Sequence, residues 1–241
     1  MRILEAKQLS KRFGGLLAVD RLDLHIDQGE ILGLIGPNGA GKTTAFNCIA
    51  GVYNATSGEI NFQGERTAGQ KPWDLCQKGL ARTFQVVKPF ASKTVLYNVT
   101  VGGFARTGVR AKAEAKAEEI LEYLHLSKKK DVTAGNLTIA ERKRLEIARA
   151  LATEPKLLLL DEVMAGLRPT EVDEMVHIIK DMRTKGVTIF LIEHIMRAVM
   201  TLSDRIVVIQ YGKKIAEGTP KEISTDEKVI KAYLGEDYAA A

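Results

Sequence analysis

The chain has 241 residues, of which 45% are hydrophobic and 27% are charged, and its formal net charge is +5. This length and hydrophobic content are sufficient for one large folded domain and exclude an intrinsically disordered chain. The apolar run at residues 187–192 is far shorter than the roughly 20 residues that cross a bilayer, and the first residues lack the apolar segment of a secretory signal. Cys48 and Cys76 lack metal-ligand spacing. We therefore expect a soluble protein in a reducing compartment, the cytoplasm.

The basic charge of the chain raises the question of a nucleic-acid or membrane-surface partner. The densest basic run, the three lysines at 128–130, is short and contains no aromatic residue. A solvated basic surface is therefore favoured, and no nucleic-acid partner is expected.

A glycine-rich segment at residues 36–44 matches the phosphate-binding pattern G-x-x-x-x-G-K-[ST]. Its residues are Gly36, Pro37, Asn38, Gly39, Ala40, Gly41, Lys42, Thr43 and Thr44. The segment follows a short apolar run typical of a buried strand and precedes a predicted helix, which favours the motif over a glycine-rich turn without function. Glycine permits positive φ and a close backbone approach, so that successive N–H groups at a helix N-terminus bind phosphate. Lys42 would reach the β- and γ-phosphates of a nucleoside triphosphate, and the Thr43 hydroxyl would ligate Mg²⁺.

The segments around this motif are predicted to be strands. Residues 2–26 have strand character, and apolar and polar residues alternate at 22–26, as in a sheet with one solvated face; His25 is then a surface residue. Phe13 lies in a loop, where it could stack on a nucleotide base, but core packing is favoured from this fact alone. Further strands are predicted at 56–62 and 80–84, and Gln85 follows the second of them.

The composition becomes typical of helices after Gln85. Residues 111–126 are rich in Ala, Glu and Lys and carry apolar residues on one side, which predicts a helix in a separate helical lobe. Thr138 and Glu141 then form a capping-box pattern at the start of a second helix. This pattern has two interpretations, a well-capped helix or a second helix N-terminus that faces phosphate.

Two carboxylates follow a run of four leucines at residues 157–160. Such a run predicts a strand buried on both faces, and the ligands of open α/β sheets gather at the carboxyl ends of these strands. Asp161 is therefore placed to hold Mg²⁺, and Glu162 to accept a proton from the attacking water.

The strand predicted at 187–192 ends close to His194, for which a functional and a structural role are equally supported. The remaining predicted elements are a helix at 170–185, a hairpin at 205–217 and a helix capped at Thr219.

The order of these features resembles that of the ATPase subunit of an ABC transporter over essentially the whole chain. Within that superfamily, several segments are similar to branched-chain amino acid importer ATPases. They are residues 12–19, 82–85, 135–137, 145–150 and 232–235. The resemblance implies an α/β fold, namely a P-loop ABC-type ATPase domain with a RecA-like core, an N-terminal antiparallel β subdomain and a helical subdomain. The chain, 1–241, would be a single domain, with 1–85 and 153–241 as the core and β subdomain and 86–152 as the helical subdomain.

The resemblance also implies roles for individual residues. Phe13 would stack on adenine, and His194 would contact the γ-phosphate. Gln85 would contact Mg²⁺ and the water and, with the segment after it, sense the membrane subunit, while Glu162 would be the general base. In this family two ATPase subunits enclose two ATP molecules, each between the P-loop of one subunit and the signature segment of the other. They drive transmembrane permease subunits from the inner face of the cell membrane.

The signature segment departs from the usual Leu-Ser-Gly-Gly-Gln of this family. Here Leu137 is followed by Thr138, Ile139, Ala140 and Glu141. Thr138 keeps the hydroxyl, but Ile139 and Ala140 place side chains where glycine allows a close approach to the γ-phosphate, and isoleucine resists positive φ. The usual Pro and Asp further on are replaced by Val163 and Arg168. Since the signature segment acts on the ATP of the partner, we expect a heterodimer in which this chain's own site is at least as active as the opposite one.

Three functions remain open from the sequence. The resemblance favours an importer ATPase, for branched-chain or related amino acids. A soluble ABC-type ATPase that acts on nucleic acid or ribosomes usually carries a long insertion or a second cassette, and this sequence has neither. A nucleotide-gated regulatory subunit would lack the base that Glu162 supplies. The expected partners are permease subunits and a second ATPase subunit, with a different chain favoured over a second copy of this one.

Overall fold

The computed structural model describes residues 1–85 and 87–234. Gly235 of the family-like segment 232–235 and the first residue of the segment after Gln85 lie outside this range.

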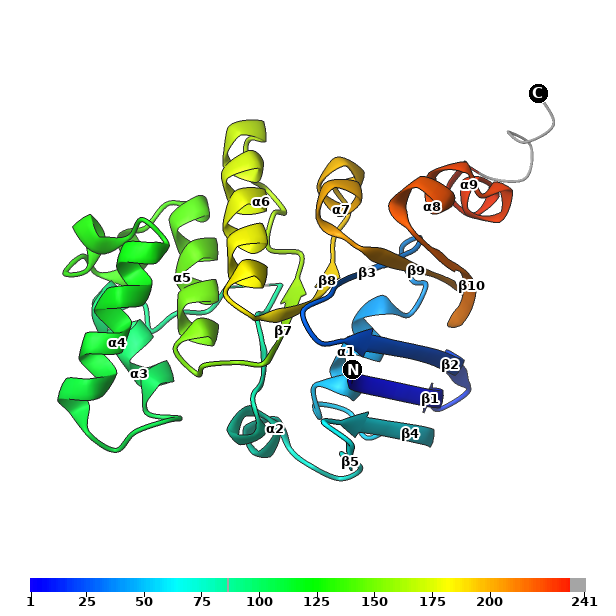
Figure 1. The fold of residues 1–241 in the computed structure, drawn as a ribbon, viewed down its shortest axis with the longest axis horizontal. Helices are drawn as coiled ribbons and strands as arrows, with labels where there is room; N and C mark the ends of the chain where they lie inside the picture. The colour runs from blue at the N-terminus through cyan, green and yellow to red at the C-terminus, as the bar shows by residue number, and fades with distance from the viewer. Residues whose placement is uncertain (86, 235–241) are drawn as a thin grey trace. The chain divides into compact units, whose positions relative to one another are not determined.

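The described chain forms two compact units (Figure 1). The first unit comprises Met1–Leu75 and Thr188–Ala241, and the second comprises Cys76–Val187. The P-loop motif belongs to the first unit, whereas Asp161 and Glu162 belong to the second.

An antiparallel sheet occupies the N-terminal part of the first unit. Its strands are β1 (Arg2–Phe13), β2 (Leu16–Asp27), β4 (Ser57–Phe62) and β5 (Glu65–Arg66), in the spatial order β2-β1-β4-β5. The predicted alternation in β2 is confirmed, because Leu22, Leu24 and Ile26 are buried while His25 is partly exposed.

A second group of strands in this unit surrounds β3, which leads into the P-loop. β3 (Ile31–Ile35) lies between β8 (Thr188–Ile192) and β9 (Arg205–Gln210) and is parallel to both. β10 (Lys213–Gly218) forms the predicted hairpin with β9. All residues of β3 and β8 are buried, as expected for parallel strands that are covered on both faces.

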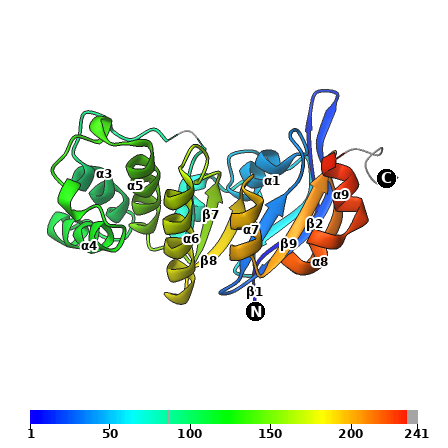
Figure 2. The ribbon, with the colours of Figure 1, turned by 90° about the horizontal axis from the view of Figure 1, so that it is seen from above.

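Helices cover both faces of these strands (Figure 2). α1 (Lys42–Ile49) lies on one side, where the rings of Phe46 and Phe190 have centroids 4.6 Å apart. The helices on the other side are α7 (Met196–Leu202), α8 (Pro220–Thr225) and α9 (Glu227–Leu234). A buried apolar cluster joins them to the strands, and its members are Ile35, Val199, Ile206, Val208, Ile223 and Val229. This packing fixes the strand and the helix that flank the P-loop.

The second unit combines two parallel strands with helices. β6 (Leu80–Arg82) pairs with β7 (Leu157–Asp161), all of whose residues are buried. The helices that pack together are α3 (Val95–Gly103), α4 (Arg110–Tyr123) and α5 (Ile139–Leu151). α6 (Pro169–Thr184) follows β7, and α2 (Pro72–Lys78) spans the boundary between the two units. The predicted helix at 111–126 corresponds to α4, and that at 170–185 corresponds to α6.

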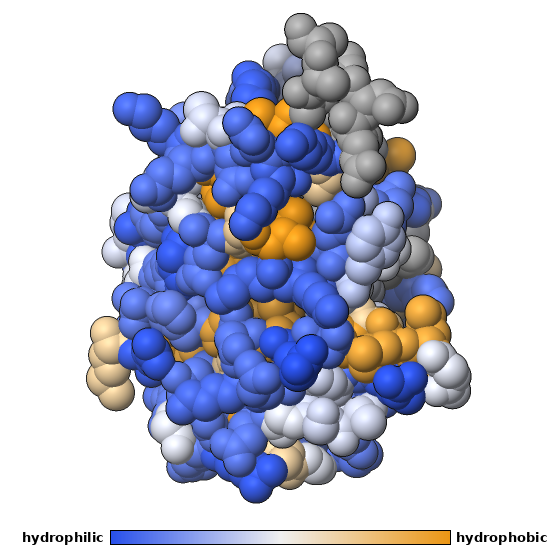
Figure 3. Space-filling view, turned by 90° about the vertical axis from the view of Figure 1, so that its right-hand side faces the viewer, coloured by the Kyte–Doolittle hydropathy of each residue, from blue (hydrophilic) through white to orange (hydrophobic). Residues whose placement is uncertain are grey.

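The helices of residues 1–85 and 87–234 include none that is both long enough and apolar enough to cross a membrane. The face shown in Figure 3 is mainly hydrophilic and carries its apolar side chains in separate patches. This surface is consistent with the high charged content of the sequence.

Candidate functional site

The P-loop of the first unit connects β3 to α1. Gly36, Gly39 and Gly41 have φ values of 153°, 77° and 102°, so the predicted positive φ is confirmed at all three glycines. Gly41 is the N-cap of α1, and the first backbone N–H groups of that helix have no partner within the helix. They carry the positive end of the helix dipole, which attracts anions.

Two of these glycines are also required by the packing of the protein itself. A Cβ at Gly36 would lie 2.0 Å from the carbonyl oxygen of Ile209, and a Cβ at Gly41 would lie 2.3 Å from that of Ala18. No atom lies within 4 Å of a Cβ built at Gly39. The sequence predicts glycine for contact with phosphate, but at positions 36 and 41 the neighbouring backbone already excludes a side chain.

The turn between β9 and β10 is hydrogen-bonded to the P-loop and to β2. The N–H of Gly212 donates to the carbonyl of Ala40 at 2.9 Å, and the carbonyl of Gly212 accepts from the N–H of Asp20 at 2.9 Å. Gly212 has a φ of 78°, and a Cβ there would lie 2.9 Å from the carbonyl oxygen of Ala18. The loop is therefore bonded to its own scaffold on the side of β2 and of the β9-β10 turn.

Lys42 lies inside the loop that it follows. The residue is only 6% exposed, and its Nζ donates to the carbonyls of Gly36 at 2.6 Å and of Pro37 at 3.0 Å. Thr43, the next residue, is exposed. A buried ammonium group beside a helix N-terminus is a cationic arrangement that suits a polyphosphate.

Asp161 ends β7 and is 1% exposed. Its backbone N–H donates to Thr83 Oγ1 at 3.1 Å, and Arg82 Nη2 lies 3.3 Å from its Oδ2. Because a buried carboxylate is unfavourable without polar partners, the guanidinium of Arg82 helps to stabilise the negative charge of Asp161. The role of Arg82 is not evident from the sequence, in which its side chain belongs to a short strand.

Glu162 breaks the extended backbone directly after β7. Its φ is 51°, a left-handed conformation that costs a residue other than glycine about 1 kcal/mol or more. Gln85 Nε2 donates to Glu162 Oε2 at 2.6 Å. The two candidate catalytic residues of the second unit are thus brought together, although 76 residues separate them in the sequence. Such strained backbone is typical of functional sites.

The signature segment begins α5 in the predicted capping box. The Thr138 hydroxyl accepts from the Glu141 N–H at 3.3 Å, and the Thr138 N–H donates to Glu141 Oε2 at 2.9 Å. Although burial opposes the effect, hydrogen bonds from Thr138 and Lys129 hold the pKa of Glu141 below its ordinary value. The concern about positive φ at Ile139 is wrong, because this residue is the first of the helix and has no positive φ. Ile139 is 60% exposed, so it differs from a glycine at this position in the volume of its side chain and not in a required positive φ. Ala140 is buried.

Phe13 is the last residue of β1 and not part of a loop as predicted, and it does not pack in the core. Its ring is 42% exposed and meets that of Tyr53 edge-on, with centroids 5.3 Å apart, while Lys11 Nζ lies 4.9 Å from its centroid. The preference for core packing is wrong, because the turn at Gly14 follows at once and leaves the ring at the surface.

His194, after β8, is also exposed, and its N–H lies 3.3 Å from Glu193 Oε2.

The two substitutions after Glu162 lie in different environments. Val163 is buried. Arg168 is the exposed N-cap of α6, and its Nη2 lies 2.8 Å from Glu171 Oε1. The positive charge of Arg168, which stands where the family usually has Asp, is therefore paired with a carboxylate in the first turn of the same helix.

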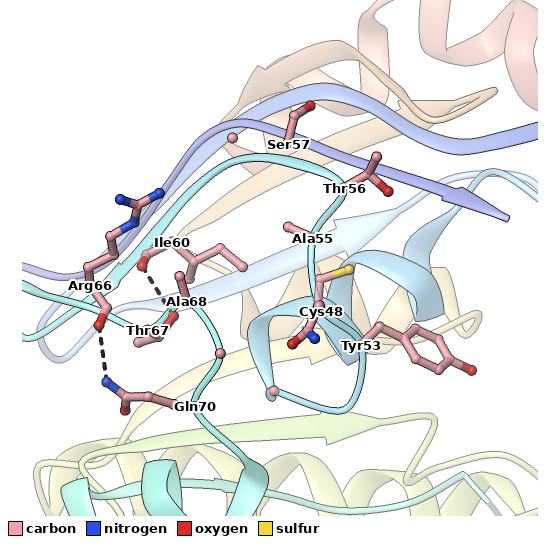
Figure 4. Close-up of a pocket in the computed structure, with 14 residues that line it drawn as sticks. Cys48, Tyr53, Ala55, Thr56, Ser57, Ile60, Arg66, Thr67, Ala68 and Gln70 are labelled. Carbon is pink, nitrogen blue, oxygen red and sulfur yellow. Dashed lines mark hydrogen bonds between the residues drawn. The ribbon is translucent and has the colours of Figure 1, made fainter.

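A cavity of about 340 Å³ lies in the first unit at the C-terminal end of α1 (Figure 4). Cys48, Tyr53, Arg66 and Gln70 are among the residues that line it. The P-loop lies at the opposite end of α1, so this cavity is separate from the candidate phosphate site.

We expect iodoacetamide at pH 8 to modify Cys76 and to spare Cys48. Cys48 is 4% exposed, and burial raises the pKa of its thiol from 9.0 to about 11, an effect that Lys11 only partly opposes. Because the folded pKa is the higher one, the protonated thiol stabilises the fold below pH 9, and this contribution is lost as the pH rises towards 11. Peptide mass spectrometry after timed alkylation measures both cysteines, with the Cys48→Ala variant to identify the Cys76 signal. Rapid modification of native Cys48 at pH 8 would contradict the expectation.

Comparison with known proteins finds relatives across the whole chain. A family model described as "ABC transporter" matches residues 19–165, and one described as "Branched-chain amino acid ATP-binding cassette transporter" matches residues 213–239. The high-affinity branched-chain amino acid transport ATP-binding protein BraF of Pseudomonas aeruginosa is 42% identical over 250 residues, which cover 97% of this chain and 98% of BraF.

Solved structures agree with this relationship. A nucleotide-free ATP-binding cassette from an ABC transporter has a TM-score of 0.90 and 32% identity, over 98% of this chain and 100% of its own. The ADP conformation of an ATP-binding cassette of an ABC transporter has a TM-score of 0.89 and 33% identity, with the same coverage. The predicted fold class, an α/β ABC-type ATPase domain, is confirmed. The chain belongs to the ABC transporter family, as one of its ATP-binding, ATP-hydrolysing cassettes.

Proposed function

We propose that this chain binds and hydrolyses ATP to power an importer of branched-chain or related amino acids. The observation that carries the substrate class is the match of residues 213–239 to a family model specific to branched-chain amino acid cassettes. Relatives named for this transport over their full length support the same conclusion. The alternative, a soluble ABC-type ATPase that acts on nucleic acid or ribosomes, is not favoured by these relatives.

The P-loop residues 36–44 bind the triphosphate in this proposal. The N–H groups at the start of α1 and the ammonium of Lys42 attract the β- and γ-phosphates, with Lys42 exchanging its carbonyl partners for phosphate oxygens. Phe13 stacks on adenine, which its exposed ring permits. His194, which is exposed just after β8, contacts the γ-phosphate.

The residues proposed to hold Mg²⁺ fit a hard cation. Thr43 offers a hydroxyl, Gln85 an amide oxygen and Asp161 a carboxylate, and oxygen atoms of these kinds are the ligands that Mg²⁺ prefers. When bound, the ion would neutralise charge on the phosphates. Gln85 already donates through its Nε2 to Glu162, which leaves its amide oxygen as the group for the cation.

Glu162 is the proposed general base. Its carboxylate accepts a proton from the water that attacks the γ-phosphate, and Gln85, at 2.6 Å, orients one carboxylate oxygen. A single conformer of this carboxylate is what an efficient proton transfer requires.

The proposed partners are transmembrane permease subunits and a second ATPase subunit, at the inner face of the cell membrane. The altered signature segment favours a different ATPase chain as the partner. In that heterodimer, the site with this chain's P-loop and Glu162 hydrolyses ATP at least as fast as the opposite site. Single-turnover rates of the two sites, measured with the base of the other removed, test this; a faster opposite site would contradict it.

Copurification tests the transport function. A tagged chain, expressed in its own cell type at natural level, should appear in the membrane fraction together with apolar permease subunits. Its ATPase rate in that complex should rise when binding protein loaded with leucine, isoleucine or valine is added. Recovery with ribosomes or nucleic acid, and no permease in the membrane fraction, would instead support the soluble alternative.

A further inference from the structure

Helix α5 carries charged side chains that reach the loop after β6. Lys143 Nζ donates to the carbonyl of Glu162 at 2.8 Å and lies 3.3 Å from the carbonyl of Gln85. One turn later, burial raises the pKa of the Glu146 carboxyl, and the Arg149 guanidinium and the backbone of Phe84 partly oppose this effect. A further turn on, Arg149 Nη1 lies 3.4 Å from the carbonyl of Lys88. Residues spaced by three lie on one side of a helix, so one face of α5 contacts Gln85, Lys88 and Glu162.

Two of these three charged residues are buried, whereas the Arg149 side chain is 26% exposed. Lys143 is 7% exposed and Glu146 is 4% exposed, while Arg149 Nη1 lies 2.8 Å from Glu146 Oε2. A buried ammonium is unfavourable unless polar groups surround it, and the two main-chain carbonyls supply such groups for Lys143. A hydrogen bond that involves a charged donor is about twice as strong as a neutral one. Lys143 therefore holds the backbone on both sides of the contact between Gln85 and Glu162.

The first turn of α5 is the signature segment. Thr138 caps the helix, and Lys143 follows within the same uninterrupted helix. An α-helix rises 1.5 Å per residue and moves as a stiff rod over this short length. Because no break in the helix lies between the signature segment and Lys143, a shift of the segment also moves Lys143.

We propose that Lys143 is a positioning residue that couples the signature segment to the base of the same chain. The inference rests on the proposed function, in which the signature segment serves the partner's ATP and Glu162 serves this chain's own. When the segment engages the partner's nucleotide, α5 moves, and Lys143 carries the backbone of Glu162 and Gln85 with it. The left-handed φ of 51° at Glu162 makes this backbone sensitive to the loss of a restraint. Lys143 thereby links the two ATP sites of the dimer.

The test is a comparison of Lys143→Met, Lys143→Arg and Lys143→Gln in the full chain with the subunits that copurify with it. Methionine keeps much of the apolar stem but removes the ammonium. We expect kcat for ATP hydrolysis to fall about 10- to 100-fold in Lys143→Met, the loss expected for a buried charged hydrogen bond. Binding of a fluorescent ATP analogue should change less than about threefold, because the P-loop is not altered. Arginine, which keeps the charge and the donors, should restore most of kcat.

A matched control and a second background separate coupling from simple destabilisation. Lys112→Met makes the same change at an exposed position of α4 and should leave kcat unchanged. In the Glu162→Gln background, Lys143→Met should cause no further loss, because the group that it positions is absent. Lys143→Gln keeps a neutral donor and provides a folded variant if the methionine variant unfolds at the assay temperature; its kcat should also fall.

Two results would overturn the inference. The first is an unchanged kcat in a folded Lys143→Met or Lys143→Gln variant while the wild type hydrolyses ATP. The second is an equal loss of nucleotide binding and kcat without rescue by arginine, which would indicate a purely structural lysine. A wild-type complex that does not hydrolyse ATP would contradict the proposed function itself, and with it this coupling.

Discussion

Glu162→Gln is expected to lower kcat for ATP hydrolysis by about 100- to 10,000-fold, the usual contribution of a positioned general base. The amide has nearly the shape of the carboxylate but cannot accept the proton of the attacking water. Its oxygen can still accept from Gln85 Nε2, so the local geometry at 2.6 Å should survive. ATP affinity should change by less than about threefold, because the P-loop that binds the phosphates is intact.

Glu154→Gln is the matched control for this prediction. Glu154 also has a left-handed backbone, with a φ of 48°, and is exposed in the same unit. The same chemical change at this position should leave kcat unchanged. If Glu162→Gln retained more than about a tenth of the wild-type rate, Glu162 would not be the general base.

The Glu162→Gln variant also tests pairing of this chain with itself. Light scattering on a sizing column, with MgATP present, measures its mass while ATP is bound and not turned over. A stable dimer would show that the signature segment with Ile139 can close over ATP, contrary to the expected heterodimer. A monomer would agree with a different partner or with assembly that needs the permease.

Gly36→Ala is expected to weaken ATP binding by at least about 100-fold, because the P-loop must move by an ångström or more to accept a Cβ. The added atom would lie 2.0 Å from the carbonyl oxygen of Ile209 and 3.2 Å from the Cβ of Ala40. We also expect the free energy of unfolding to fall by about 3 kcal/mol, the upper range for overpacking a well-packed site. Thermal unfolding and titration with a fluorescent ATP analogue measure the two effects.

Gly39→Ala separates steric overlap from backbone strain. Gly39 shares the positive φ, at 77°, but a Cβ there meets no atom within 4 Å. The free energy of unfolding should fall by only about 1 kcal/mol, the penalty for alanine in a left-handed conformation. If Gly39→Ala were as unstable as Gly36→Ala, overlap with Ile209 would not be the cause of the loss at position 36.

The sequence predicts the parts of the fold in which local pattern and tertiary structure agree. The alternation in β2, the mainly apolar and fully buried strands β3, β7 and β8, and the caps at Thr138 and Thr219 are all local signals, and the structure contains each of them. The P-loop is predicted as well, because its glycines and its lysine must lie at a fixed spacing.

α3 was not predictable from its composition. Its sequence contains three valines, a threonine and two glycines, which are poor helix formers. Thr94 caps the helix by accepting from the Tyr97 N–H at 3.1 Å, and packing against α4 and α5 supplies the stability that propensity does not. Such tertiary contacts leave no periodic mark in a single sequence.

The candidate site was predictable in its residues but not in its supports. Asp161 ends β7, and Gln85 and Glu162 follow strands, so their positions at strand ends identify all three as candidates. Arg82 and Lys143 support them through contacts between distant segments. In the sequence, Lys143 is one basic residue among three neighbours, Arg142, Lys143 and Arg144, and only burial distinguishes it from them.

The hydrogen bonds that Gly212 makes with Ala40 of the P-loop and with Asp20 of β2 have an energetic consequence for transport. A loop that its scaffold already holds loses little conformational entropy when a nucleotide enters. The free energy of ATP binding is then not offset by ordering the loop and remains available to shift the assembly from open to closed. Stiffness in the β9-β10 turn would in this way set the fraction of the ATP binding energy that reaches the permease.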